Sequence, residues 1–330
     1  MAPTLLEEVL PPQLTPVAGV RAALERRRAR PGGRAYAVLR WGGAALFAAV
    51  VVGLVISLAD GSSQAFAHSG LGLLWSGTWD PAHLRYGAGV FVLGTLVTTL
   101  VAIVLAVPIG VGTAAFLSEF APRWIAAPLS VLVDLIAAVP SIVVGLWGLL
   151  VLSPVFARHV EPFFKKIPVL EWFFHGPALG PSMLLAGVVL AVMILPTVVA
   201  LSRTALSAVP VADREAARAL GGTKWQVVRS AVIPGGRTGI EAAVTLAMGR
   251  ALGETIAVAM VIGNLYTAPH SLLAPGATLG SAIINTFAEA TPGLDRSAVI
   301  ALALVLLVIT ALVNAGGQLL LRSRMRARTA

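Results

Sequence analysis

The chain has 330 residues, of which 57% are hydrophobic and 12% are charged, and its mean hydropathy is +0.88. Soluble domains of this size carry about 25% charged residues, so most of this chain cannot face water. The absence of cysteine excludes disulfides and thiolate metal sites. The formal net charge of +9 could indicate a nucleic-acid-binding protein, but the positions of the charges, described below, indicate otherwise.

Six apolar runs follow one another along the chain. A bilayer-spanning helix needs about 20 mostly apolar residues, and backbone polar groups in hydrocarbon must pair within the helix. Pro108 and Pro140 interrupt the second and third runs, which are long enough to tilt or kink. The pattern predicts an all-α, polytopic membrane protein with six transmembrane helices, at residues 38–59, 88–117, 125–152, 183–202, 239–262 and 297–320.

Lysine and arginine are unevenly divided between the two sides of this arrangement. The segments on the side of both termini carry 18 of them, the opposite segments carry 5, and Arg250 lies inside a run. Positive residues stay in the cytoplasm, so both termini and the loop at 203–238 are predicted to be cytoplasmic, in the plasma (inner) membrane. The basic excess therefore reflects topology and not nucleic-acid binding. The tail at 1–35 shows no secretory signal and is predicted to lie against anionic membrane lipid.

The loop between the fourth and fifth runs reads VPVADREAARALGGTKWQVVRSAVIPGGRTGI. Pro210 suits the first turn of a helix, and Asp213 and Glu215 then lie near the positive end of its dipole. Gly221 or Gly222 can end that helix in a left-handed conformation. We expect a first short helix here.

The next residues, TKWQ, fit a capping box that starts a second short helix, which Pro234 is expected to end. Small side chains on the first helix let another surface approach closely, and a polar rim flanks them. The small face is Ala216, Ala217 and Ala219, and the rim is Arg214, Arg218 and Lys224. The loop is either a docking element or a segment that packs on its own bundle.

The letters EAARALG, followed by AVIP, resemble the EAA loop of ABC-importer permeases. The residues on its register are Glu215, Ala216, Ala217, Gly221 and Pro234, while Ala231 and Ile233 depart from the usual Ile and Leu. The resemblance implies that this loop, with Arg214 and Arg218 beside the register, is the coupling element that sits in a groove of a cytoplasmic ATPase.

Further stretches extend the resemblance over residues 88–320. GTLVTTLVAIVLAVPIGVGTAAFLSEF, AAVPSIVVGLWGLLVLSP, MILPTVVALSRTALSAVP and GRALGETIAVAMVIGN look like the C-type permease of the phosphate-specific (Pst) ABC importer. This implies the ABC-importer permease (MetI-like) fold with cytoplasmic coupling helices. It also implies four kinds of partner: a second permease of the PstA type, two ATP-binding subunits of the PstB type that hold ATP and Mg, an extracytoplasmic phosphate-binding protein of the PstS type, and membrane lipid.

The expected organisation follows from the runs and the resemblance. It comprises a cytoplasmic tail at 1–35, a first transmembrane helix and extracytoplasmic loop at 36–87, a permease core at 88–320 with the coupling loop at 209–238, and a basic cytoplasmic tail at 321–330.

Charged groups inside the runs are the candidates for the substrate path. Arg250 and Glu254 are four residues apart, so on one helix they share a face, and Gly249 and Gly253 beside them allow a neighbouring helix to come close. Asp134 lies in the third run. A guanidinium recognises a tetrahedral oxyanion through its fork of donors. Either these groups form a structural ion pair, with Asp134 as the other partner of Arg250, or they line the path and exchange a carboxylate for phosphate.

The sequence carries no phosphate-binding G-x-x-x-x-G-K-[ST] loop and no H-E-x-x-H motif, and its five histidines fall outside the runs. We therefore expect a transport subunit and not an enzyme, without catalytic residues, metal or cofactor of its own. The predicted function is ATP-driven import of inorganic phosphate. An ABC permease for another oxyanion, such as sulfate or molybdate, and a secondary transporter or channel are the alternatives.

Overall fold

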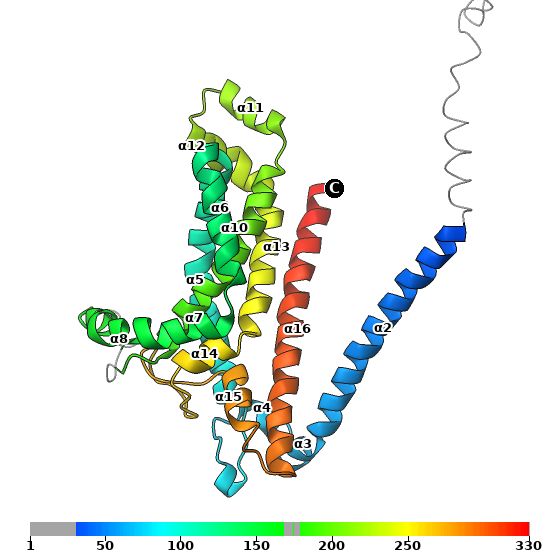
Figure 1. Ribbon diagram of the computed structural model, residues 1–330, viewed down its shortest axis with the longest axis vertical. Coiled ribbons are helices and arrows are strands. Elements are labelled where there is room, and N and C mark those ends of the chain that lie inside the picture. The colour runs from blue at the N-terminus through cyan, green and yellow to red at the C-terminus, as the bar shows by residue number, and fades with distance from the viewer. Residues whose placement is uncertain (1–30, 168–173, 175–178, 330) are drawn as a thin grey trace, which may run out of the picture. The chain divides into compact units, whose positions relative to one another are not determined.

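The computed structural model describes residues 31–167, 174 and 179–329, so most of the predicted tail at 1–35, namely residues 1–30, lies outside them. The chain divides into two compact units, Met1–Ser57 and Leu58–Ala330. The long and medium helices, coloured along the chain in Figure 1, are α2 (Pro31–Gly61), α5 (Gly89–Ala115), α6 (Arg123–Ala138), α10 (Met183–Ser207), α13 (Ile233–Leu252) and α16 (Leu294–Thr329). The short ones are α3 (Ser63–Ser69), α4 (Gly72–Trp75), α7 (Ser141–Trp147), α8 (Ser153–Val155), α9 (Glu161–Lys165), α11 (Val211–Ala219), α12 (Lys224–Val227), α14 (Ile256–Val261) and α15 (Leu279–Thr286).

Helix α10 forms the centre of the second unit, between α5 and α13. Small residues make this packing close. A β-carbon at Gly187 would stand 2.5 Å from the Val101 side chain, and one at Gly110 would stand 2.7 Å from Val198. Most of the buried side chains of α10 belong to a single hydrophobic cluster that also contains residues of α5 and α14. The long helices are therefore held by tight contact between apolar surfaces, as expected inside a bilayer.

Five described helical stretches are long and apolar enough to cross a membrane. Four of them confirm predicted spans: Tyr36–Gly61, Gly89–Phe120, Met183–Ser207 and Leu294–Ser323. Pro108 and Pro196 lie inside α5 and α10 without ending them.

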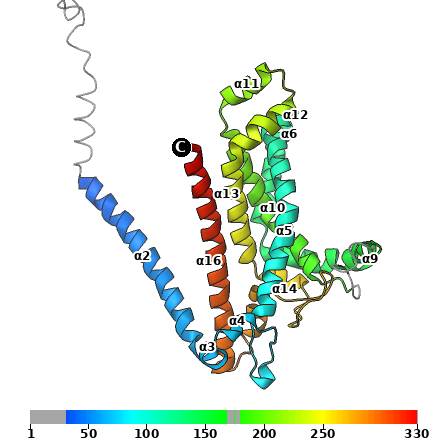
Figure 2. The ribbon, with the colours of Figure 1, turned by 180° about the vertical axis from the view of Figure 1, so that it is seen from behind.

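The predicted third span, 125–152, is wrong as a single helix. α6 ends at Ala138, Pro140 caps the separate helix α7, and the apolar stretch runs on as Ser141–Lys165. The proline has no N–H to continue the ladder of α6, and the residue before a proline is pushed to extended backbone, as Val139 is with ψ of 128°. In both views the helices after Pro140 run across the direction of the long helices (Figures 1 and 2).

The predicted fifth span, 239–262, is also interrupted. α13 ends at Leu252, Gly253 caps it, and α14 begins at Ile256. A helix from elsewhere in the chain supports the break, because a β-carbon at Gly280 of α15 would stand 2.8 Å from the Thr255 hydroxyl. Gly249 admits α16 closely, with Asn314 Oδ1 2.6 Å from a β-carbon placed there, whereas no other helix comes within 4 Å at Gly253.

Helices α11 and α12 lie at the same end of the second unit as the C-terminal end of α16 (Figure 2). The expectation that Pro234 ends the second short helix is wrong. From Lys224 the chain continues as helix through the π-helical turn η6 (Val228–Val232) into α13, where Pro234 occupies the first turn. The turn directly before Pro234 is π-helical, and this local change of winding accommodates a residue without an N–H inside a continuing helix.

Candidate functional site: the coupling elbow and the polar residues along the bundle

Helices α11 and α12, with the turn at residues 220–223 between them, form an elbow. Its first helix, α11, begins and ends as its residues predict. Pro210 caps α11 at its N-terminus. Gly221 has a positive φ of 82°, which glycine adopts without strain, and it follows the last turn of the helix. The Thr223 hydroxyl accepts from the Gln226 amide, and the Gln226 side chain accepts from the Thr223 amide at 2.8 Å. The predicted capping box is therefore confirmed, and it fixes the angle at which α12 leaves α11.

The outer face of α11 is open among the described residues. Glu215, Ala216, Arg218 and Ala219 are exposed, and Leu220 at its C-cap is 90% exposed. Ala217 instead turns inward and packs against the cluster of buried side chains below the elbow. The predicted small-residue face is therefore divided: Ala216 and Ala219 face outward, and Ala217 packs against the bundle.

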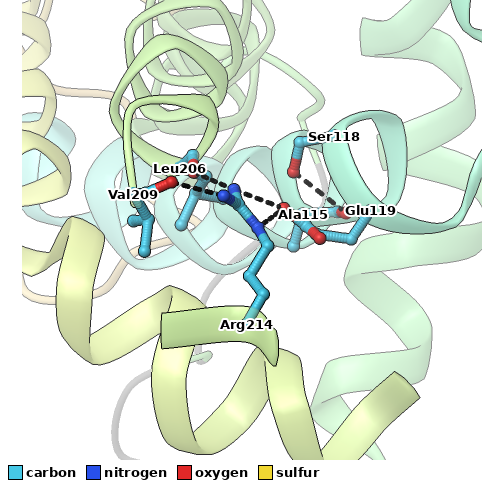
Figure 3. Close-up of polar contacts among 6 residues, drawn as sticks. All are labelled: Ala115, Ser118, Glu119, Leu206, Val209 and Arg214. Carbon is cyan, nitrogen blue, oxygen red and sulfur yellow. Dashed lines mark hydrogen bonds and ion pairs between the residues drawn. The ribbon is translucent and has the colours of Figure 1, made fainter. Parts of the chain in front are cut away.

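Arg214 anchors α11 to the ends of two long helices (Figure 3). Its guanidinium donates to Glu119 Oε1 at 3.0 and 3.3 Å, to the Leu206 carbonyl at 2.8 Å and to the Val209 carbonyl. The two carbonyls lie at the C-terminal end of α10, where backbone acceptors lack helical partners and a positive charge is favoured. Glu119 lies in the π-helical turn η2 (Phe116–Phe120) that ends α5.

The expectation that Arg214 belongs to an outer polar rim is therefore wrong. Its side chain is 12% exposed and that of Glu119 is 10% exposed. A buried arginine needs acceptors for its N–H groups, and the Glu119 carboxylate and the Leu206 and Val209 carbonyls supply them where the ends of α5 and α10 meet. Sequence analysis missed Glu119, although a lone acid at the end of a long apolar run is the signal that marks it.

Arg250 occupies the last turn of α13 and is exposed. Its Nη1 donates to the Thr197 hydroxyl of α10 at 3.3 Å. No carboxylate of the described residues lies within 4.0 Å of its guanidinium. The predicted face shared with Glu254 does not form, because the helix ends between the two residues. Arg250 thus offers its remaining donors to an open surface.

Glu254 lies in the break between α13 and α14, close to Ser141 at the start of α7 and to Arg250. Two close helix crossings bring Ser141 there. A β-carbon at Gly145 would stand 2.8 Å from Cα of Ala257, and Gly148 is similarly close to Val261. The stretches VPSIVVGLWG and GRALGET, more than 90 residues apart, are therefore neighbours in space.

Asp134 lies elsewhere, on an exposed position of α6. It lines a cavity with Arg203 of α10 and with Ser130, and Arg203 Nη1 donates to the Ser130 hydroxyl. The prediction that Asp134 partners Arg250 is not met in this structure. Arg203 was not predicted as a site residue, because it was counted among the positive residues that indicate which side of the membrane is cytoplasmic.

One charged pair in and beside the fifth apolar run was not predicted. Glu241, within that run, accepts from Arg237 at 2.9 Å, four residues earlier on α13. Helical spacing alone was sufficient to find this pair.

Residues 106–326 match the family described as binding-protein-dependent transport system inner membrane component. The match covers the elbow, both broken helices and α16. The chain belongs to this family. It is a multi-pass membrane protein and a permease subunit of the ABC-transporter type.

Relatives and solved structures agree with this assignment. The permease is 41% identical over 280 residues to the phosphate transport system permease protein PstC of Pasteurella multocida, covering 84% of this chain and 86% of the relative. It is 43% identical over 277 residues to PstC of Haemophilus influenzae, covering 82% and 88%. Its fold is similar to that of the MetNI methionine ABC transporter in an inward-facing conformation, with a TM-score of 0.53 at 20% identity, covering 74% of this chain and 99% of that one. A bacterial ABC transporter for import of the polysaccharide alginate gives a TM-score of 0.53 at 13% identity, covering 87% and 98%. These likenesses confirm the predicted permease fold.

Proposed function

We propose that the chain forms half of the path through which inorganic phosphate is imported at the expense of ATP. The observation that carries this proposal is the identity of 41–43% with PstC permeases over most of both chains. An exposed arginine held by a hydroxyl agrees with it, because Arg250 keeps the donor fork that suits a tetrahedral oxyanion. Arg250 recognises phosphate, and Glu254 with Ser141 supports the bend beside it.

The end of the bundle that carries α11 is cytoplasmic in this proposal. Its support is the excess of Lys and Arg in the segments at that end, since positive residues remain inside. The outer face of α11, with Ala216, Ala219 and the exposed Leu220, enters a groove of an ATP-binding subunit of the PstB type. A PstA-type permease supplies the other half of the path, and a PstS-type protein delivers phosphate on the opposite side.

Coupling runs through the anchor of α11. A displacement of α11 by the ATPase is carried by Arg214 to the ends of α5 and α10. α10 also carries Thr197, which holds Arg250 of α13. Closure of the ATPase subunits therefore moves the ends of α5 and α10, and through Thr197 of α10 it shifts the arginine that binds phosphate.

The test is uptake of labelled phosphate by the complete transporter in proteoliposomes, with ATP or a non-hydrolysable analogue inside the ATPase compartment. We expect uptake that requires hydrolysis and that continues in excess sulfate and molybdate. Displacement of phosphate by sulfate or molybdate assigns the permease to another oxyanion, and uptake without any ATPase subunit assigns it to the secondary transporters or channels. Co-purification of the ATPase with this chain is the accompanying control.

A further inference from the structure

A cavity lies between α6, α10 and the turn η2, and Arg250 does not line it. Its volume is about 400 Å³. Its lining is mixed: the apolar side chains of Leu117, Val133, Val199 and Ala200 form one part, and the polar part is Ser130, Asp134, Arg203, Thr204 and Ser207. The space is large enough for a tetrahedral oxyanion and several waters, since a water takes about 30 Å³ of liquid.

Arg203 carries the positive charge in this cavity, and that charge has no carboxylate partner at ion-pair distance among the described residues. One of its nitrogens donates to the Ser130 hydroxyl. No carboxylate of the described residues lies within 4.0 Å of its guanidinium, although Asp134 lines the same cavity. A guanidinium has five donors, so most of its hydrogen-bonding capacity is directed at the cavity or at solvent. A partly buried and unneutralised arginine is a recognised oxyanion ligand.

Arg203 lies on α10, the helix that also carries Thr197, the hydroxyl to which Arg250 of α13 donates. Arg203 comes six residues after Thr197 on α10, so the two levels are about 9 Å apart along the axis at 1.5 Å per residue. Arg203 is the closer of the two to the elbow at α11. Six residues also turn the helix by about 240°, so Arg203 faces α6 while Thr197 faces α13, and the cavity is a site separate from that of Arg250.

We propose that Arg203, Ser130 and Asp134 form a second phosphate-binding station, nearer the elbow than Arg250. The inference rests on the proposed function. Arg203 and Ser130 donate to phosphate oxygens, and the Asp134 carboxylate accepts a hydrogen bond from the hydroxyl of hydrogen phosphate, which keeps its proton. Sulfate has no such proton at neutral pH, so its oxygen would face the Asp134 carboxylate directly and be repelled. A lipid phosphodiester shares the oxyanion chemistry but also lacks the proton, and Asp134 therefore selects free hydrogen phosphate.

The absence of native cysteine allows a direct test. Ser207→Cys places one thiol on the cavity wall, four residues from Arg203 on the same helix face, and Ser230→Cys places one on the exposed surface of η6 outside the cavity. The rate of modification by a negatively charged thiosulfonate is measured on this chain in the complete transporter in maltoside. Phosphate, sulfate or a short-chain phosphatidylglycerol is added in separate reactions.

We expect phosphate to slow modification of S207C by about tenfold, as loss of access to an occupied charged site implies, and to leave S230C unchanged. Sulfate and the lipid should protect little. R203Q should abolish protection by phosphate, whereas R123Q, which removes a charge from α6 outside the cavity, should not. D134N should let sulfate protect as well as phosphate does, a change in selectivity that a purely structural role of Asp134 does not produce.

Three results overturn the inference: phosphate protection that survives R203Q, equal protection of S207C and S230C, or protection by the lipid alone. If R203Q fails to assemble, S130A takes its place, and undiminished protection in S130A then counts against the station. Failure of the proposed function is distinguishable, because it appears as absence of phosphate uptake by the unmodified transporter.

Discussion

The Arg214 anchor gives the sharpest prediction about coupling. Replacing Arg214 with Met keeps much of the side-chain volume but removes every donor to Glu119 and to the Leu206 and Val209 carbonyls. The Glu119 carboxylate, 10% exposed, is then buried without its cation. Breaking a buried pair from one side costs about 3–5 kcal/mol of stability. E119Q keeps an acceptor for the guanidinium and loses only the charge, so its cost should be smaller, about 1.5–3 kcal/mol.

A double variant separates stability from coupling. R214M/E119L replaces both partners with apolar side chains, which for buried pairs is often nearly neutral in stability. We expect it to recover most of the thermal stability lost by R214M, yet to transport less phosphate per ATP hydrolysed, because α11 is no longer tied to α5 and α10. The assay is uptake and hydrolysis measured together in proteoliposomes, with R229Q on the exposed surface of η6 as the matched loss of charge. A double variant that couples as well as R229Q would refute the role of the anchor.

Three further predictions test the surfaces and crossings. L220D should weaken co-purification of the ATPase by about tenfold or more, because a charge replaces a 90% exposed apolar contact, while L71D on another exposed site should not. G145V should lower the thermal stability of the purified permease by about 1–3 kcal/mol through overpacking against Ala257, whereas G112V, with open space around it, should have little effect; equal stabilities would contradict the crossing. T197V should reduce phosphate uptake without loss of ATPase binding, since it removes the hydroxyl that holds Arg250, and unchanged uptake would show that this contact is dispensable.

The continuous helices could be predicted from sequence because their signal is local. The runs at 88–117 and 183–202 are uniformly apolar, and α5 and α10 begin within a residue of the predicted positions. The capping box at Thr223 could likewise be predicted from neighbouring residues, as could a left-handed glycine at Gly221 or Gly222, and the structure has it at Gly221. In each case the determining contacts lie within a few positions along the chain.

The two broken helices depend on residues far away in sequence. Composition cannot show that Gly280 lets α15 press against Thr255, or that Gly145 lets α7 cross α14 at Ala257. Without knowledge of these contacts, Gly253 is interpreted as a glycine inside a continuous transmembrane helix. The same limitation placed Arg250 and Glu254 on one face and joined Asp134 to Arg250.

The inward turn of Arg214 had a similar cause. Sequence analysis read its position on a short polar helix correctly but had no information that the ends of α5 and α10 meet beneath it. Glu119 and the Leu206 carbonyl come from segments about 90 residues apart. The resemblance to the EAA loop identified the element, and only the structure identified what anchors it.

The central claim is that phosphate passes Arg250, and ATP-driven uptake by R250Q in the assembled transporter tests it most directly. R237Q, at the other end of the same helix, is the control for loss of an arginine. The account predicts normal assembly and ATPase binding in R250Q, with phosphate uptake near background, while R237Q transports at close to the unmodified rate. Uptake by R250Q equal to that of R237Q would contradict it.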